Sequence, residues 1–528
     1  MGIYLNPNNV NFSRDLASEI YIDKSMLLSV LNKMINTNRN LLCVSRPRRF
    51  GKSMAENMMA AYYSKGADSR SLFAELKFGK DPSFEKYLNK CNVIMIDMNG
   101  MFNNREAGYS TVKFFTKAIA AELRDAFPMV EIRDTQTLPD MIGAVYQATG
   151  EQFIIIIDEY DVLVREKVSR DEFAEYLQFL NGMFKNANLL PAIMLAYMTG
   201  ILPIVRDKIQ SKLNNFKEYT MLGAGSLTEF VGFTEDETRS LCERYNMDFA
   251  ECRRWFNGYH LKDMDIYNPN AVVTAMLDGE YGNYWAKTGS YEALKDYILM
   301  NFDGIKDDVV AMLGGKRVKV EVMSYLNTMT DFAGKDDVFT YLIHLGYLAY
   351  DSVTKSCYIP NYEIRCEWVI AIKESPDYAY IMKMINASEE LLEATLECDE
   401  SAVAAALDNA HSVVMNNLTY NKEACFQSAI VLSYFYARSK YTIVTELPTG
   451  KGYADVAFIP FVQNVPAIII ELKNTAKATA ETALDQIKSK QYFAGLEHYS
   501  GDILLVGVSY DPENKEHQCR IERMCNEE

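Results

Sequence analysis

A glycine, a lysine and a serine stand in the segment 46–53 at the spacing of a phosphate-binding loop. Gly51, Lys52 and Ser53 match the end of the pattern G-x-x-x-x-G-K-[ST], between an apolar run at 41–45 and a helical pattern. In such a loop, backbone N–H groups and the N-terminus of the helix attract phosphate. The lysine reaches the β- and γ-phosphates of a nucleotide, and the serine ligates Mg²⁺. The spacing therefore predicts a site for ATP and Mg²⁺ at this loop.

The other residues of the loop are less typical of the pattern. Arg46 occupies the position of the first glycine. Arg48 and Arg49 either bind phosphate or are exposed loop arginines, and both interpretations are open for each residue. Together with Phe50 and Met54, which flank the glycine, the lysine and the serine, they complete the predicted nucleotide-binding set.

Two acidic residues at the end of the apolar segment 153–158 could complete the same site. Asp158 and Glu159 follow four consecutive isoleucines. A buried strand that delivers an aspartate at its C-terminal end supplies the Mg²⁺ ligand of a P-loop protein. Glu159 is placed to act as general base on an attacking water, and Thr199, at the end of the next buried run, could sense the γ-phosphate. Taken alone, the acidic pair is better explained as a solvated strand end, so its assignment depends on the loop.

A second group of charged residues lies in the C-terminal part of the chain. The segments 453–459 and 467–472 are predicted strands of an antiparallel hairpin centred on residue 463. That register places Asp455 directly opposite Glu471. Lys473 follows two residues later and therefore shares the same face of the sheet.

Two carboxylates and one ammonium on one patch are the groups that metal-dependent cleavage of a phosphodiester needs. We expect Asp455 and Glu471 to hold Mg²⁺, or Mn²⁺ in its place, through hard oxygen ligands. The metal would activate water and neutralise phosphate charge, and Lys473 would orient the water or stabilise developing charge. Glu423, on the preceding predicted helix, is the candidate third carboxylate. The alternative is an ordinary cross-strand salt bridge.

Both groups require α/β domains to position them. Continuous apolar runs indicate strands buried on both faces, and helical patterns between them predict a parallel five-stranded sheet covered by helices. The runs are 41–45, 93–97, 153–158, 192–199 and 219–222. The last part of the chain predicts the order αβββαβ, over the segments 423–437, 441–447, 453–459, 467–472, 481–493 and 503–508.

The region between these domains is mainly helical in pattern. A helix at 338–348, short strands at 349–351 and 357–360, and a helix from 361 predict a winged-helix-like unit. A lid subdomain with a small hairpin is an equally good interpretation. The predicted domains are 1–233 (ATPase), 234–416 (helical and winged-helix-like) and 417–528 (nuclease-like).

Charge and composition limit the classes of protein. With 54 basic and 71 acidic residues the net charge is −17, which argues against a protein that coats nucleic acid or anionic membrane without specificity. The first residues lack the features of a secretory signal. The longest uncharged stretch, 186–205, is interrupted by two prolines and a glycine, so no membrane partner is expected. Ten cysteines without paired spacing fit reduced thiols in the cytoplasm.

Several segments together resemble the bacterial AAA-ATPase-like proteins that carry a C-terminal PD-(D/E)XK nuclease domain. They are 21–25, 46–53, 154–161, 198–200, 231–235, 255–259 and 267–269. The resemblance spans nearly the whole chain. It implies an ATPase core of the RecA/AAA kind, in which an arginine at the position of Arg46 is common.

The resemblance extends to the second group of residues and implies a restriction-endonuclease-like fold for the last domain. The spacing D-x15-E-x-K of Asp455, Glu471 and Lys473 matches the nuclease motif, with alanine where the motif often has proline. Gln486 and Tyr492 resemble accessory residues of this nuclease class.

Two functions from different classes remain open. The first is an ATPase whose nucleotide cycle controls a metal-dependent nuclease that acts on nucleic acid, with DNA as the expected form. The second is a nucleotide-dependent switch whose silent nuclease-like domain binds DNA or a protein partner. Assembly into a homo-oligomer is also open. A ring would need a finger residue from a neighbouring copy, and the candidates Arg206, Lys208 and Lys212 fit solvated helix charges better.

Overall fold

The computed structural model describes most of the chain and divides it into two compact units. The described residues are 2–204, 213–285, 291–300, 302, 304–323, 332–373, 375–414, 423–449, 452–460, 465–474, 478–496, 499 and 501–525. The first unit joins Met1–Tyr284 to Lys319–Glu363, and the second joins Trp285–Val318 to Ile364–Glu528. The finger candidates Arg206, Lys208 and Lys212 and the predicted turn at 462–464 lie outside the described residues. The division into three domains stays a prediction.

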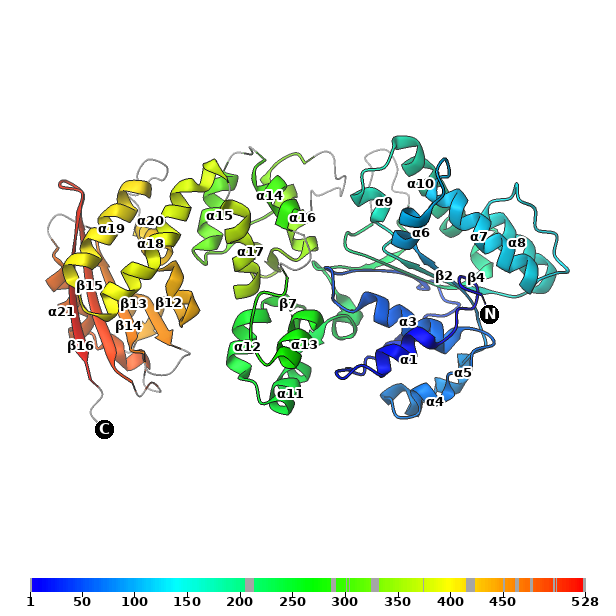
Figure 1. Cartoon of the computed structure of the whole chain (residues 1–528), viewed down its shortest axis with the longest axis horizontal. Coiled ribbons are helices and arrows are strands. Elements are labelled where there is room, and N and C mark those ends of the chain that lie inside the picture. Colours follow the sequence, from blue (N-terminus) through cyan, green and yellow to red (C-terminus); the bar gives the residue numbers. More distant parts are fainter. Residues whose placement is uncertain are drawn as a thin grey trace. The chain divides into compact units, whose positions relative to one another are not determined.

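A parallel five-stranded sheet forms the centre of the first unit and confirms the predicted fold (Figure 1). Its strands are β1 (Leu41–Ser45), β2 (Asn92–Asp97), β3 (Phe153–Asp158), β4 (Ile193–Gly200) and β5 (Lys217–Tyr219). The order is β2-β3-β4-β1-β5, and the paired strands run parallel. Every residue of β1, β3 and β4 is buried, which explains their uninterrupted apolar runs.

Helices cover both faces of this sheet. α7 (Thr111–Ala126), α8 (Leu138–Thr149) and α10 (Arg170–Phe184) share one core with the strands. α3 (Lys52–Tyr63) lies across the opposite face with α1 (Val10–Leu16) (Figure 1). Local signals start these helices, because the Ser110 hydroxyl accepts from Lys113 N before α7, and a capping box opens α8 at Thr137.

The rest of the first unit contains two small sheets. The sheet β6-β8-β7 joins β6 (Phe233–Thr234), β7 (Tyr259–Leu261) and β8 (Met264–Tyr267) beside α11 (Glu235–Tyr245), α12 (Phe249–Phe256) and α13 (Pro269–Asp278). The predicted helix and hairpin occur as α16 (Lys335–Leu345), β10 (Ala349–Asp351) and β11 (Ser356–Tyr358). The predicted second helix occurs as α17 (Tyr362–Lys373), which belongs to the second unit from Ile364 onward. A third strand, β9 (Val318–Lys319), joins the hairpin, which the sequence did not reveal. The winged-helix identity of this unit stays a prediction.

A second five-stranded sheet dominates the second unit, with the order β12-β13-β14-β15-β16. Its strands are β12 (Tyr441–Thr449), β13 (Gly452–Pro460), β14 (Ala467–Lys473), β15 (Ile503–Asp511) and β16 (Glu516–Met524). β14 and β15 run parallel and the other pairs are antiparallel. The fold agrees with the predicted αβββαβ order, and β16 is a further strand that this order did not include.

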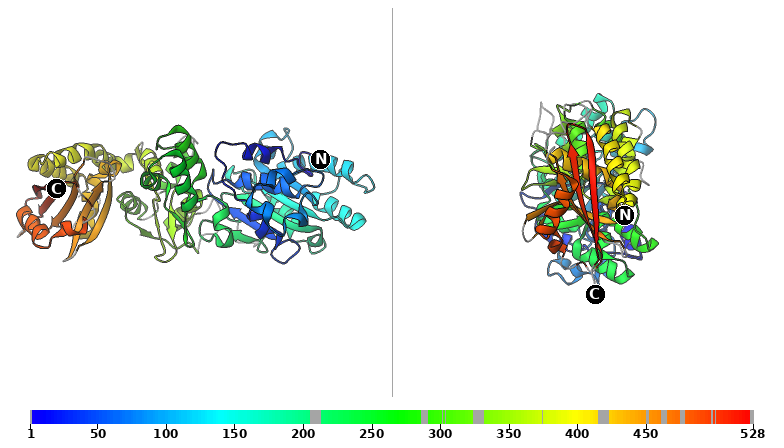
Figure 2. Two further views of the ribbon diagram at one scale, coloured as in Figure 1. Left: turned by 90° about the horizontal axis from the view of Figure 1, so that it is seen from below. Right: turned by 90° about the vertical axis from the view of Figure 1, so that its left-hand side faces the viewer.

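Helices flank this second sheet as well (Figure 2). α21 (Ala480–Ser489) packs against β14 and β15, where a side chain on Gly507 would meet the Ala480 carbonyl oxygen. α18 (Ala379–Leu396), α19 (Glu400–Val414) and α20 (Glu423–Ser433) form a helical layer, in which α19 contacts β16 and α20 contacts β13. α14 (Tyr291–Ile298) and α15 (Ile305–Leu313) complete the unit.

Candidate functional sites

The predicted phosphate loop connects β1 to α3 and is shaped by its backbone. Arg46 N donates to Gly200 O (3.0 Å), which fixes the start of the loop to the end of β4. Gly51 caps α3 with φ +86°, and a Cβ placed on it would meet no atom within 4 Å. Arg49 also has positive φ, +67°. The loop therefore curves around open space at the N-terminus of α3, as binding of a phosphate requires.

The ammonium of Lys52 lies inside this loop. Its Nζ donates to the carbonyl oxygens of Arg46 (3.1 Å) and Pro47 (2.9 Å), and the side chain is buried. Burial lowers the pKa of Lys52, and the nearby carboxylate of Asp158 partly opposes this shift. Backbone carbonyls are weak partners for a buried charge compared with an anion. A nucleotide phosphate can therefore replace them.

The predicted Mg²⁺ ligands lie together at the ends of neighbouring strands. Ser53 Oγ donates to Asp158 Oδ2 (2.8 Å). Thr199 Oγ1 lies 2.6 Å from Asp158 Oδ1, because β3 and β4 run parallel side by side and Ile157 pairs with Met198, the residues just before these two. These hydroxyl and carboxylate oxygens are the hard donors that Mg²⁺ prefers. The residues present fit ATP and Mg²⁺.

Sequence reasoning missed a third acidic residue in this group. Glu56 is fully buried on α3, and its Oε1 lies 2.6 Å from Thr199 Oγ1. Burial raises the pKa of Glu56 well above its ordinary value, and the charge of Asp158 adds to the rise. A signal was present, because Glu56 follows Ser53 by three residues and so faces the same side of the helix.

The predicted general base, Glu159, is held by an arginine that the sequence analysis did not consider. Glu159 Oε2 accepts from Arg165 Nη2 (2.8 Å), and Arg165 Nε lies 3.3 Å from Asp161 Oδ2. Glu159 has φ +49°, a left-handed conformation that is uncommon for a residue other than glycine. The side chain of Glu159 is 29% exposed, so water can reach it.

The remaining predicted nucleotide-binding residues separate into exposed and buried groups. Arg48, Arg49 and Met54 are exposed, and Arg49 Nη1 contacts Tyr284 O at 3.5 Å. The Phe50 side chain is buried, so only its backbone N–H remains for a phosphate. A role for the two arginines in binding phosphate stays a prediction, and Met54 lies on the first turn of α3.

The second site is centred on β14 and α21. Lys473 Nζ donates to Glu471 Oε1 (2.8 Å) and to Gln486 Oε1 (2.7 Å). Gln486 Nε2 in turn bonds Glu471 Oε1 and the Tyr492 hydroxyl, the latter at 2.9 Å. The structure thus places both accessory residues, Gln486 and Tyr492, beside the predicted catalytic pair.

Asp455 reaches this group in a way that the predicted hairpin did not anticipate. The register is the expected one, since Val456 pairs with Ile470, but the ladder between the described residues of β13 and β14 ends there. Asp455 Oδ2 instead accepts from Leu472 N (2.7 Å), on the backbone between Glu471 and Lys473. Asp455 therefore approaches the site through its side chain and not as a ladder partner.

Glu471 has the chemistry of a metal ligand. Its side chain is 4% exposed, and its Oε2 has no hydrogen-bond partner among the described residues. Burial raises the pKa of Glu471, Asp455 raises it further, and the hydrogen bond from Lys473 lowers it. A buried carboxylate oxygen without a partner is unfavourable unless a cation or a donor joins it. The carboxylate oxygens of Asp455 and Glu471 fit Mg²⁺ or Mn²⁺. The predicted third carboxylate, Glu423, is the first residue of α20, and its side chain lies outside the described ones.

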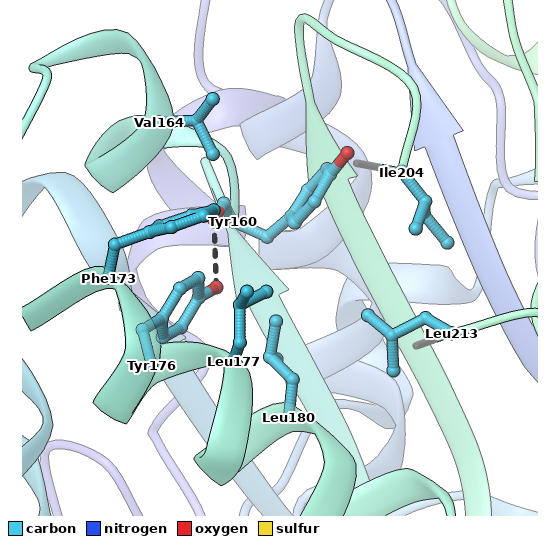
Figure 3. Close-up of a pocket in the computed structure, with 8 residues that line it drawn as sticks. All are labelled: Tyr160, Val164, Phe173, Tyr176, Leu177, Leu180, Ile204 and Leu213. Carbon is cyan, nitrogen blue, oxygen red and sulfur yellow. Dashed lines mark hydrogen bonds between the residues drawn. The ribbon is translucent and has the colours of Figure 1, made fainter. Parts of the chain in front are cut away.

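A small apolar pocket lies between α10 and the segment that follows β3, the strand that ends at Asp158 (Figure 3). Tyr160, Phe173, Tyr176, Leu180 and Leu213 are among its lining residues, and Tyr176 OH donates to Tyr160 O (2.8 Å). Its volume of about 10 Å³ is close to that of one water molecule. It is too small for a nucleotide.

Among the helices in the described part of the chain, none is both long and apolar enough to cross a bilayer.

Known proteins resemble this chain in both of these regions. Residues 13–210 match the family described as predicted AAA-ATPase, and residues 421–519 match the PD-(D/E)XK nuclease superfamily. The "Uncharacterized protein in vnfD 5'region" of Azotobacter chroococcum mcd 1 is 22% identical over 493 residues, which cover 89% of this chain and 90% of that protein.

Two solved structures from Aeropyrum pernix are also similar. The ORC2 protein, in ADPNP–ADP complexes, is 12% identical with a TM-score of 0.30, over 68% of this chain and 98% of that chain. The ORC1 protein in complex with DNA is 13% identical with a TM-score of 0.26, over 72% and 99%. The first match includes β1 to β4 of the first five-stranded sheet, and the second includes β12 to β15 and the start of β16 in the other, so the chain combines a domain of the predicted AAA-ATPase family with a domain of the PD-(D/E)XK nuclease superfamily.

Proposed function

We propose that this protein hydrolyses ATP and that its nucleotide cycle controls a metal-dependent phosphodiesterase acting on nucleic acid, with DNA as the expected substrate. One observation carries the nuclease half of the proposal. Glu471 presents a buried oxygen that has no partner among the described residues, beside Lys473 in a domain of the PD-(D/E)XK superfamily. An ordinary cross-strand salt bridge would not leave that oxygen unsatisfied.

In the first site each residue has a role that follows from its position. Lys52 and the backbone of the loop bind the β- and γ-phosphates, and Ser53 and Asp158 hold Mg²⁺. Glu159 takes the proton of the attacking water, and Thr199 reports on the γ-phosphate through its contact with Asp158. Their arrangement around one loop supports hydrolysis as well as binding.

In the second site Asp455 and Glu471 would hold the metal ion, with Glu423 as the proposed third carboxylate. A bound Mg²⁺ or Mn²⁺ supplies an activated water and neutralises charge on the scissile phosphate. Lys473 donates a hydrogen bond to the carboxylate of Glu471, and its charge can stabilise the negative charge that develops on the phosphate oxygens. Gln486 fixes the Lys473 ammonium at the site.

The test is cleavage of supercoiled plasmid with Mg²⁺ or Mn²⁺, with and without ATP. Lys473→Ala is expected to reduce nicking by about 100-fold or more, the effect typical of losing a catalytic electrostatic group, without changing ATP hydrolysis. Lys52→Ala is expected to abolish ATP hydrolysis and the response of nicking to ATP. Lys488→Ala, which removes an exposed lysine of α21 paired with Glu522, is the matched control and should behave as the natural protein.

The second candidate is a nucleotide-dependent switch whose nuclease-like domain binds DNA or a protein partner without cutting. One observation favours it: the net charge of the chain is −17, which is unfavourable for a protein that must hold a polyanion for cleavage. It predicts ATP hydrolysis and plasmid binding with no nicking above the Lys473→Ala background. That result would replace the nuclease half of the proposal and leave the ATPase half standing.

A further inference from the structure

Arg165 lies within the first site although no phosphate-loop pattern includes it. It ends the short helix α9 (Val162–Arg165), and its side chain is only 9% exposed. Its Nη2 donates to Glu159 Oε2 (2.8 Å), while its Nε lies 3.3 Å from Asp161 Oδ2. One guanidinium thus spans two carboxylates, and its rigid planar shape fixes the angle between them.

Asp161 anchors this arrangement to the loop that follows β4. Its side chain is fully buried, and Oδ2 accepts from Ile201 N (3.1 Å) and Leu202 N (2.9 Å). A Cβ on Gly200 would lie 2.7 Å from Asp161 Oδ1, so the backbone after Thr199 is packed tightly against this carboxylate. The contacts therefore run from the loop after Thr199 through Asp161 and Arg165 to Glu159.

The two oxygens of Glu159 are consequently not equivalent. Oε2 is held by Arg165, whereas no described residue bonds Oε1, and the side chain retains exposure to solvent. The left-handed backbone of Glu159 shows that its position is determined by its surroundings and not by local preference. A general base needs this arrangement, in which a third group orients the base and leaves one atom for the proton.

We infer that Arg165 is a positioning residue for ATP hydrolysis, which holds Glu159 so that Oε1 faces the attacking water, with Asp161 as its anchor. This inference rests on the proposed hydrolysis of ATP. It assigns Arg165 no contact with the nucleotide. Loss of Arg165 should therefore affect the rate of the chemical step and not the affinity for ATP.

The experiment measures kcat and KM for ATP hydrolysis, and ATP affinity, on the full chain carrying Arg165→Ala, Arg165→Lys, Glu159→Gln, or Arg165→Ala with Glu159→Gln. We expect Arg165→Ala to lower kcat by roughly 10- to 100-fold, within the effect of general-base catalysis, with KM and affinity changed less than about twofold. Arg165→Lys should recover part of kcat. In the Glu159→Gln background, Arg165→Ala should lower kcat no further, because both changes act through one group.

The control is Arg124→Ala, which removes an arginine that contacts Asp134 and Ile132 O and touches neither the phosphate loop nor β3. It should leave kcat unchanged. The inference is wrong if Arg165→Ala leaves kcat unchanged, weakens ATP affinity as much as it lowers kcat, or lowers kcat further in the Glu159→Gln protein. If the natural protein hydrolyses ATP no faster than Lys52→Ala, the proposed hydrolysis itself fails, and the role of Arg165 falls with it.

Discussion

The ring of Phe50, the residue before Gly51 in the phosphate loop, packs edge-on against the ring of Tyr259, with centroids 5.6 Å apart and planes 79° from parallel. Tyr259 lies on β7, and its hydroxyl donates to Gly346 O (2.6 Å) just after α16. Two side chains therefore connect the phosphate loop to the helix–hairpin–helix unit. A change of the loop on nucleotide binding has a direct physical route to that unit.

The contact between Phe50 and Tyr259 should contribute to the stability of the first unit. Phe50→Ala is expected to lower the free energy of unfolding by about 3–5 kcal/mol, because it removes a fully buried ring and leaves a cavity. Tyr259→Phe keeps the ring, loses one hydrogen bond, and should cost about 1 kcal/mol. Urea unfolding would measure both. Tyr109→Ala, at an exposed tyrosine, is the control, and a loss as large as that of Phe50→Ala would contradict the prediction.

Glu56 should support the Mg²⁺ site without touching the nucleotide. Glu56→Gln retains a group that can bond Thr199 and should lower the free energy of unfolding by less than about 1.5 kcal/mol. Glu56→Ala leaves a cavity and removes a hydrogen-bond partner of Thr199, so the free energy of unfolding should fall by about 2–4 kcal/mol. Hydrolysis of ATP by this variant should also require a higher Mg²⁺ concentration. Thermal unfolding and Mg²⁺ titration of the ATPase rate would show both effects. Equal behaviour of the two variants would rule out this role.

His344 should make the first unit sensitive to acid. Burial on α16 lowers its pKa from 6.5 to about 3. The unfolded chain therefore binds a proton near pH 6.5, whereas the folded protein does not until about pH 3. Stability is full above pH 6.5 and falls as the pH decreases toward 3, by about 2 kcal/mol between pH 7 and pH 5.

The measurement is the free energy of unfolding across pH 7 to 5 in the natural protein and in His344→Leu. The slope over this range, rather than the absolute stability, should differ between the two. Parallel curves for the natural protein and His344→Leu would contradict the prediction.

Gly258 should tolerate no side chain, and two separate reasons can be distinguished. Its φ is +114°, and a Cβ would lie 2.0 Å from the backbone oxygen of Pro360. Gly258→Ala is therefore expected to cost about 3 kcal/mol or more. Gly279→Ala has a similar backbone, with φ +71°, but open space, and should cost about 1 kcal/mol. Denaturant unfolding of both variants would separate strain from collision, and similar losses would show that collision contributes little.

The sequence predicted elements whose environment is uniform. The strand 153–158 is buried on both faces, so its apolar run had one interpretation. β16 was not predicted from the sequence. In this strand His517 and Cys519 are buried, whereas Glu516, Gln518 and Arg520 are exposed. A strand that pairs on one side only and carries so many charges resembles a solvated tail in sequence. The helix predicted at 481–493 ends at Ser489. The pattern of the residues around this position changes too little to show where the helix ends.

For the candidate sites, spacing identified residues that lie near each other along a strand or loop. Glu471 and Lys473 are two residues apart, and Ser53 follows Lys52, so their grouping was visible. Arg165 was not, because its contact with Glu159 depends on the turn after β3. The predicted register of Asp455 was right, but its predicted contact was not. The ladder of β13 and β14 ends one pair before Asp455 would face Glu471, and the side chain of Asp455 accepts from Leu472 N instead.

The chain passes between the two compact units three times, after Tyr284, after Val318 and after Glu363. Dividing the gene at one position therefore cannot yield both units as separate intact polypeptides, because one fragment would always carry part of the other unit. The unit that contains the predicted phosphate loop and the unit that contains the nuclease-like domain therefore cannot be separated by cutting the chain at one position.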